Sequence, residues 1–115
     1  MKIWKVTDEA IIFDNDMEIT FDHDQDCCEY NYADFSILTP NTVHYDYDFS
    51  ENLDFKYIDE LGFKFGSDGH WIFIPCYSEQ NGYYTTQIDI YYGKKGKSKK
   101  TKNWVLSFDA QFVDC

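Results

Sequence analysis

Residues 23–29 read His-Asp-Gln-Asp-Cys-Cys-Glu and place nitrogen, sulfur and oxygen donors within seven consecutive positions. Proteins hold Zn²⁺ through these donor types, supplied by Cys, His and Asp or Glu side chains. The segment therefore offers a zinc site, which would be formed by His23, Asp26, Cys27 and Cys28. Adjacent side chains of an extended chain point to opposite faces, so both cysteines would be ligands only if the backbone turns between them. His44 or Cys76 would then complete the site from another strand.

The same segment has a purely structural interpretation, and the sequence favours it over the metal site. A side chain such as that of Asp26 or Gln25 can cap a short helix by accepting hydrogen bonds from its first backbone N–H groups. In this arrangement one cysteine packs inward and His23 anchors the preceding strand. A calcium site is disfavoured, because the run Asp22-x-Asp24-x-Asp26 lacks the glycine and the terminal Glu of an EF-hand loop. We therefore expect no cofactor, with zinc as the alternative.

A cysteine nucleophile is the enzymatic interpretation of this segment. Cys27 or Cys28 would attack, a histidine would act as base, and Asp26 or Gln25 would orient that base. Reactive thiolates form beside cations and helix N-termini. This neighbourhood instead holds five carboxylates, which disfavour a thiolate: Asp22, Asp24, Asp26, Glu29 and Asp34. We therefore expect a protein that is not an enzyme.

The charge of the chain is strongly negative and unevenly distributed. The net charge is −11, residues 1–60 hold 16 acidic residues against 3 lysines, and the chain has no arginine. Nucleic-acid backbones and anionic membranes bind clustered basic charge, so we expect neither as a direct partner. The expected partner is a host protein with a basic surface, and carboxylates spaced along strands would then imitate a phosphate backbone. The candidates for this display are Asp22, Asp24, Asp46, Asp48 and Asp54.

Six lysines fall within residues 94–102, between two predicted strands. Isolated charge runs are usually solvated, so we expect a solvent-exposed hairpin tip. If this tip makes a contact, the acidic half of a second copy would attract it. A head-to-tail oligomer is therefore possible.

Tyrosine is a second candidate for a binding surface. The chain holds ten tyrosines, more than a core of this size needs, and tyrosine is enriched in interface hot spots. The dipeptide Asn81-Gly82 predicts a turn leading into a strand. We assign partner binding to the residues that follow it, Tyr83 and Tyr84. A wider recognition face would add Tyr77, Tyr91 and Tyr92.

The composition favours β-structure. Aromatic residues make up 20% of the 115 positions, and pleated sheets favour aromatic and β-branched residues, whereas helices favour Ala and Leu. We predict one domain over residues 1–115. Its fold should be mainly β, an antiparallel sheet, sandwich or open barrel with at most one or two short helices.

Alternating or short apolar runs separated by turn signals place the strands along the chain. They predict strands at 3–6, 10–13, 17–21, 43–49, 62–65, 71–77, 83–92 and 104–108. The polar residues 14–16 predict one hairpin turn, and residues 66–69, with glycine at both ends, predict another. Residues 29–38 and 53–58 are compatible with either a strand or a short helix, and residues 78–82 read as a polar loop. Cys76 lies in an apolar run and should be a small buried side chain. The chain has no run of about 20 apolar residues and begins with a strand pattern, so we expect a cytoplasmic protein.

Two blocks of the sequence resemble an uncharacterised family of small phage and bacterial domains. Residues 23–29 look like that family's H-x-Q-D-C-C-E signature, and Asn81-Gly82-Tyr83-Tyr84 is similar to its later N-G-Y-Y block. Residues 39–61, the lysine-rich hairpin and the last strand have no counterpart in the family pattern. The resemblance implies a compact β-rich domain carried by a phage or mobile element, and it implies no activity. An acidic inhibitor or accessory protein that docks on a basic host protein is therefore the expected function, and a metal- or small-ligand-binding domain is the alternative.

Overall fold

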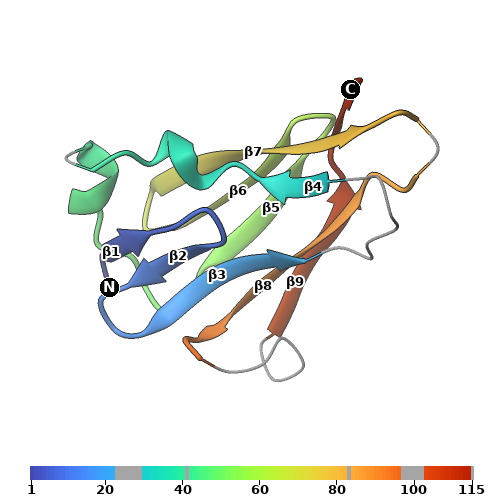
Figure 1. The fold of residues 1–115 in the computed structure, drawn as a ribbon. Coiled ribbons are helices and arrows are strands. Elements are labelled where there is room, and N and C mark those ends of the chain that lie inside the picture. The colour runs from blue at the N-terminus through green and yellow to red at the C-terminus, as the bar shows by residue number, and fades with distance from the viewer. Residues whose placement is uncertain (23–29, 41, 83, 97–102, 115) are drawn as a thin grey trace.

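The computed structural model describes residues 1–22, 30–40, 42–82, 84–96 and 103–114 (Figure 1). These residues form two packed β-sheets, as predicted for a mainly β protein. The strands are β1 (Ile3–Val6), β2 (Ala10–Phe13), β3 (Met17–Asp22), β4 (Tyr30–Ala33), β5 (Asp54–Ile58), β6 (Gly62–Ser67), β7 (His70–Gln80), β8 (Gln87–Lys94), β9 (Asn103–Asp109) and β10 (Gln111–Asp114). Two single-turn 3-10 helices, η1 (Phe35–Ile37) and η2 (Val43–Asp46), complete the described elements.

The first sheet is antiparallel and has the strand order β1-β2-β3-β8-β9. Its β2–β3 hairpin follows the predicted polar turn. Asp16 adopts a φ of 68° there, and the Asn15 side chain accepts a hydrogen bond from the Met17 N–H at 3.2 Å. Asp and Asn tolerate the left-handed region better than other side chains do, which is why the chain reverses at this point.

The second sheet has the strand order β10-β7-β6-β5, and β4 also pairs with β7. The eleven-residue strand β7 pairs with β6 along its first half. Its second half pairs with β4, antiparallel, and with β10, parallel. Strand β4 is thereby fixed on β7, with Tyr32 directly opposite Tyr77.

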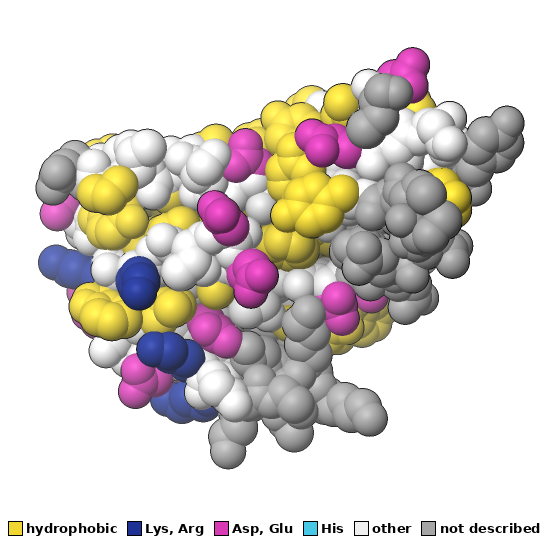
Figure 2. Space-filling model, viewed as in Figure 1, with side chains coloured by type: hydrophobic (Ala, Val, Ile, Leu, Met, Phe, Trp, Pro, Cys, Tyr) yellow, Lys and Arg dark blue, Asp and Glu magenta, His cyan; other side chains and the backbone are white. Residues whose placement is uncertain are grey.

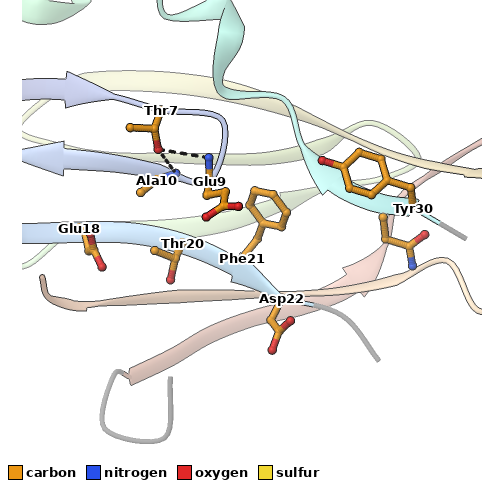
Figure 3. A pocket seen from close by; sticks show the side chains of 9 residues that line it. Thr7, Glu9, Ala10, Glu18, Thr20, Phe21, Asp22 and Tyr30 are labelled. Carbon is orange, nitrogen blue, oxygen red and sulfur yellow. Dashed lines mark hydrogen bonds between the residues drawn. The ribbon is translucent and has the colours of Figure 1, made fainter. Parts of the chain in front are cut away.

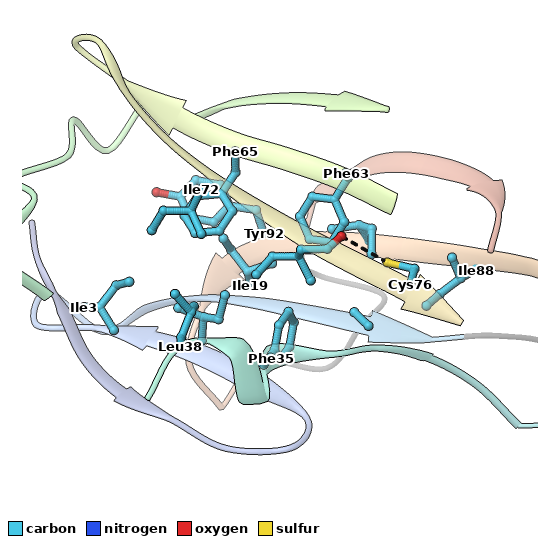
Figure 4. Packing of buried hydrophobic residues seen from close by; sticks show 14 of the residues in the cluster. Ile3, Ile19, Phe35, Leu38, Phe63, Phe65, Ile72, Cys76, Ile88 and Tyr92 are labelled. Atoms are coloured by element: carbon cyan, nitrogen blue, oxygen red, sulfur yellow. Dashed lines mark hydrogen bonds between the residues drawn. The ribbon is translucent and has the colours of Figure 1, made fainter. Parts of the chain in front are cut away.

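The hydrophobic core lies between the two sheets (Figure 4). Every second residue of a strand faces one side of its sheet, so Ile72, Ile74 and Cys76 of β7 point inward and are at most 1% exposed. Strand β8 contributes Ile88 and Ile90 in the same way. The prediction that Cys76 is a small buried side chain is therefore confirmed.

The predicted strand at residues 43–49 is wrong. Its alternation would have buried Val43, which is 60% exposed. Local bonds replace the strand ladder, since the Tyr45 N–H donates to the Thr42 carbonyl at 3.2 Å within η2. Phe49 is the fully buried residue of this segment and packs edge-on against Phe13, while Tyr45 and Tyr47 are partly buried against the core. Apolar and polar residues therefore alternate in this segment although it does not pair in a sheet.

Two strand boundaries differ from the prediction, and the structure decides three further points. Residues 78–80 belong to strand β7 instead of a loop, because their polar side chains are hydrogen-bonded inside the protein. Strand β8 begins at Gln87, later than predicted. The two ambiguous segments resolve as β4 followed by η1 and as β5. The β6–β7 hairpin is confirmed, with its turn at Asp68 and Gly69, whose φ angles are 53° and 83°.

The described residues contain no helix long and apolar enough to cross a membrane.

Candidate functional site

Three tyrosines form a stack on the outer side of the second sheet. Tyr30 and Tyr32 are two positions apart in β4 and share one face, and their rings stack 4.8 Å apart at 25°. Tyr77, opposite Tyr32 in β7, lies 5.7 Å from it in a tilted arrangement. Cross-strand aromatic pairs of this kind stabilise a sheet. Tyr30, at the end of the stack, remains 51% exposed.

Carboxylates border the stack. The Tyr32 hydroxyl donates to Glu79 Oε1 at 3.1 Å. Asp8 and Asp34 line a hollow of about 180 Å³ together with Tyr30 and Tyr32. Asp34 is held in place because its Oδ1 accepts a hydrogen bond from the Ser36 N–H at 3.1 Å, at the start of η1. Figure 2 shows this hydrophobic patch over β4 with acidic side chains beside it.

A second hollow, of about 390 Å³, opens on the other side of Tyr30 (Figure 3). It lies between the β1–β2 turn, β3 and β4, and its lining includes the carboxylates of Glu9, Glu18 and Asp22. Thr20 also lines it and is 8% exposed, and within the described part of the chain its hydroxyl has no hydrogen-bond partner. None of the described residues that line the two hollows is a lysine.

We call this region the tyrosine–carboxylate surface. It is defined by Tyr30, Tyr32, Tyr77, Asp8, Glu9, Asp22, Asp34 and Glu79. Six of these residues lie in or beside β3 and β4 or in the β1–β2 turn, and two lie in β7. The surface combines large aromatic area with dense negative charge.

The environment of Tyr32 keeps its phenol protonated. Burial raises the pKa of Tyr32 to about 12, and the hydrogen bond to Glu79 and the negative charge of Asp34 act in the same direction. A neutral phenol can donate to Glu79, whereas a phenolate would repel it. Tyr32 therefore holds Glu79 in position over the whole physiological pH range.

We expect the protein to lose stability in alkaline solution. Burial raises the pKa of the Cys76 thiol and, beside Glu51, that of the Tyr92 phenol, as it does for Tyr32. The folded protein therefore binds these protons more tightly than the unfolded chain does. The contribution of the three groups to the free energy of unfolding is complete below their ordinary pKa values and is lost as the pH rises toward 12. Melting temperatures measured by circular dichroism from pH 8 to pH 12 should fall above about pH 9. Tyr32→Phe should make this fall shallower, and a melting temperature that stays flat to pH 12 would contradict the assignment.

A buried polar network fixes β4 in place. Asn31 is fully buried, and its side-chain amide donates to the carbonyls of Thr85 at 3.0 Å and Gln87 at 3.1 Å. Its Oδ1 accepts from the Ser78 hydroxyl at 2.5 Å. Gln80 donates to that hydroxyl at 2.7 Å and accepts from the Tyr84 N–H at 2.8 Å. The network joins β4, β7 and the segment before β8, and so it holds Tyr30 and Tyr32 against the rest of the protein.

The predicted metal ligands His23, Asp26, Cys27 and Cys28 lie outside the described residues, as do Asp24 and Tyr83. Among the residues that the structure describes, no group of three or more His, Cys, Asp or Glu side chains could hold a metal ion. His44, proposed as a further ligand, is half-buried in η2 and its ring lies edge-on to Tyr47.

The predicted partner-binding residues are dispersed. Asp22 ends β3 and lines the larger hollow. Asp46 ends η2 and Asp54 begins β5, both exposed. Asp48 accepts a hydrogen bond from the N-terminal ammonium at 2.9 Å, and this contact lowers its pKa. Tyr84 is half-buried beside Gln80. Of these five, Asp22 alone belongs to the tyrosine–carboxylate surface.

Sequence reasoning missed most of this surface. The period-two spacing of Tyr30, Tyr32 and Asp34 is visible in the sequence, whereas Asp8 comes to the stack through tertiary packing. Tyr92, assigned to the recognition face, is instead 8% exposed and donates to the Glu51 carbonyl at 2.7 Å inside the protein.

Comparisons with protein-family models, curated proteins and solved structures give no match for this chain. The geometry of the described residues is therefore the basis for a functional proposal.

Proposed function

We propose that this protein is a non-enzymatic binding protein that docks, through its tyrosine–carboxylate surface, on a basic surface of another protein. The proposal includes a role as an inhibitor or accessory protein of phage or mobile-element origin. It also includes action in the cytoplasm, where a thiol such as that of Cys76 stays reduced.

The observation that supports this proposal is that carboxylates border an exposed tyrosine stack. Tyrosine supplies a large contact area at low entropic cost and is enriched in hot spots. Charge complementarity then selects the partner and speeds the encounter. The carboxylates next to the stack make the charge of this surface uniformly negative, since none of the described residues that line the two hollows is a lysine.

Binding to a positively charged partner should depend on salt. Exposed charges farther apart than a Debye length of about 8 Å are largely screened at physiological ionic strength. The immobilised protein should therefore capture its partner from a cell lysate at about 50 mM salt and release it at about 500 mM. Tyr30→Ala and the double variant Asp8→Asn/Asp34→Asn should each weaken capture at least about tenfold, the effect of losing a hot-spot residue or its charges.

Two control variants test which surface is responsible. Asp68→Asn makes the same charge change in the exposed β6–β7 turn, where Asn tolerates the left-handed backbone, and should leave capture intact. Asp46→Asn/Asp54→Asn tests the dispersed display predicted from the sequence. Loss of capture in this variant, with normal capture by Tyr30→Ala, would refute docking through the tyrosine–carboxylate surface.

A further inference from the structure

We infer that the tyrosine–carboxylate surface takes an arginine side chain of its partner, stacked on Tyr30 in the larger hollow. This inference rests on the proposed function, because it names the chemical group that the docking surface recognises. Three features of the hollow support it: the free area of an aromatic ring, the sign of the lining charge, and a buried hydroxyl that no described residue hydrogen-bonds.

The aromatic feature is the end of the tyrosine stack. Tyr32 covers one side of the Tyr30 ring at 4.8 Å, and half of Tyr30 is still exposed. Figure 3 shows the Tyr30 ring reaching from β4 toward Phe21 and Glu9 over the hollow that all three line. A planar cation can therefore extend the stack by one layer. The guanidinium of arginine is planar and weakly hydrated, and it stacks on aromatic faces more readily than an ammonium does.

The charge of the hollow matches a guanidinium. Its described lining contains three carboxylates, of Glu9, Glu18 and Asp22, and no lysine. Glu9 is exposed at the β1–β2 turn, where its backbone N–H donates to the Thr7 hydroxyl at 3.2 Å. This turn presents the Glu9 side chain at the hollow (Figure 3). A carboxylate in this position can accept two parallel hydrogen bonds from one guanidinium.

The hydroxyl is the independent observation that points to a ligand. Thr20 lies in the wall of the hollow on β3 and is more than nine-tenths buried, and its Oγ1 has no hydrogen-bond partner among the residues that the structure describes. Buried polar groups in folded proteins are nearly always paired. A guanidinium carries five N–H donors in a fixed fork, so it can bond a carboxylate and still donate to a hydroxyl. The volume of about 390 Å³ accommodates such a side chain.

The experiment compares two peptides of equal length and charge, hexa-arginine and hexa-lysine, each labelled for fluorescence anisotropy. The wild-type protein should bind hexa-arginine roughly three- to fivefold more tightly, the difference expected for a stacked cation at a partly exposed site. Tyr30→Ala and Thr20→Val should each bring the ratio of the two dissociation constants close to one. Asp68→Asn, the control in the distant turn, should preserve the ratio.

The outcomes separate this inference from the proposed function. Equal affinities of the wild-type protein for the two peptides, both weakened by Asp8→Asn/Asp34→Asn, would overturn the arginine site and leave the docking surface standing. An arginine preference that survives both Tyr30→Ala and Thr20→Val would also overturn it, because the preference would then arise elsewhere. Peptide binding that no variant of the tyrosine–carboxylate surface weakens would overturn the inference and the proposed function together.

Discussion

Gly66→Ala should unfold the protein or lower its free energy of unfolding by about 3 kcal/mol or more, as overpacking against backbone does. Gly66 lies in β6, opposite Trp71 of β7. A Cβ atom at this position would lie 2.0 Å from the His70 carbonyl oxygen and 3.0 Å from the Trp71 Cα. Both contacts are with backbone, so no side-chain rotation can relieve them. The two strands would have to separate next to the β6–β7 turn.

Two matched glycine variants distinguish this steric effect from a general loss of glycine. A Cβ at Gly69 or at Gly96 meets nothing within 4 Å, and their φ angles are 83° and 81°. Alanine at either position should therefore incur only the left-handed backbone penalty of about 1–2 kcal/mol. Urea denaturation of the three variants measures the difference. A Gly66→Ala protein as stable as the Gly69→Ala protein would show that the strands do not approach as closely as the structure has them.

Asn31→Leu should lower the free energy of unfolding by about 2–4 kcal/mol, the effect of leaving two buried polar groups unpaired. The substitution keeps the number and branching of side-chain heavy atoms but removes both donors and the acceptor. The Gln87 carbonyl would lose the donor at 3.1 Å, and the Ser78 hydroxyl would lose its acceptor. The Thr85 carbonyl would keep its bond from Gln80 at 3.0 Å.

The control for this variant is Asn52→Leu, at an exposed position outside the network. Its effect on the free energy of unfolding should stay within about 0.5 kcal/mol, as for most surface changes. Thermal unfolding should place Asn31→Leu roughly 10 °C below the control for a chain of this size. Because Asn31 separates Tyr30 from Tyr32 in β4, the folded fraction of the variant should also bind partners more weakly. Equal melting temperatures for the two variants would contradict the network.

The sequence predicted those parts of the fold that local pattern determines. The β2–β3 hairpin follows from the alternation of Met17, Ile19 and Phe21 after a turn of Asp and Asn residues. The β6–β7 hairpin follows from its Asp-Gly turn. Residues 43–49 show the limit of this reasoning, because they alternate regularly, yet local hydrogen bonds hold residues 43–46 in η2 and residues 47–49 form no strand.

Polar residues mark the second limit. Ser78 and Gln80 read as a loop, since side-chain polarity suggests solvent, but both are buried in β7 and bonded to one another. Whether a polar side chain finds an internal partner depends on distant residues such as Asn31, 47 positions from Ser78. The candidate site likewise depends on residues that are distant in the sequence. The pairing of β4 with β7 brings Tyr32 to Tyr77, and packing brings Asp8 to Tyr30. These residues are too far apart in the sequence for a local motif to predict that they meet.

Hydroxyl-radical footprinting of the protein, free and bound to its captured partner, tests the central claim most directly. Tyrosine side chains are oxidised where solvent reaches them, and Tyr30 and Tyr57 are both exposed, at 51% and 39%. Tyr57 stacks on Phe108, away from the tyrosine–carboxylate surface, and serves as the internal reference. Docking through that surface predicts strong protection of Tyr30 with unchanged oxidation of Tyr57. Unchanged oxidation of Tyr30 in a complex of full occupancy would contradict the account.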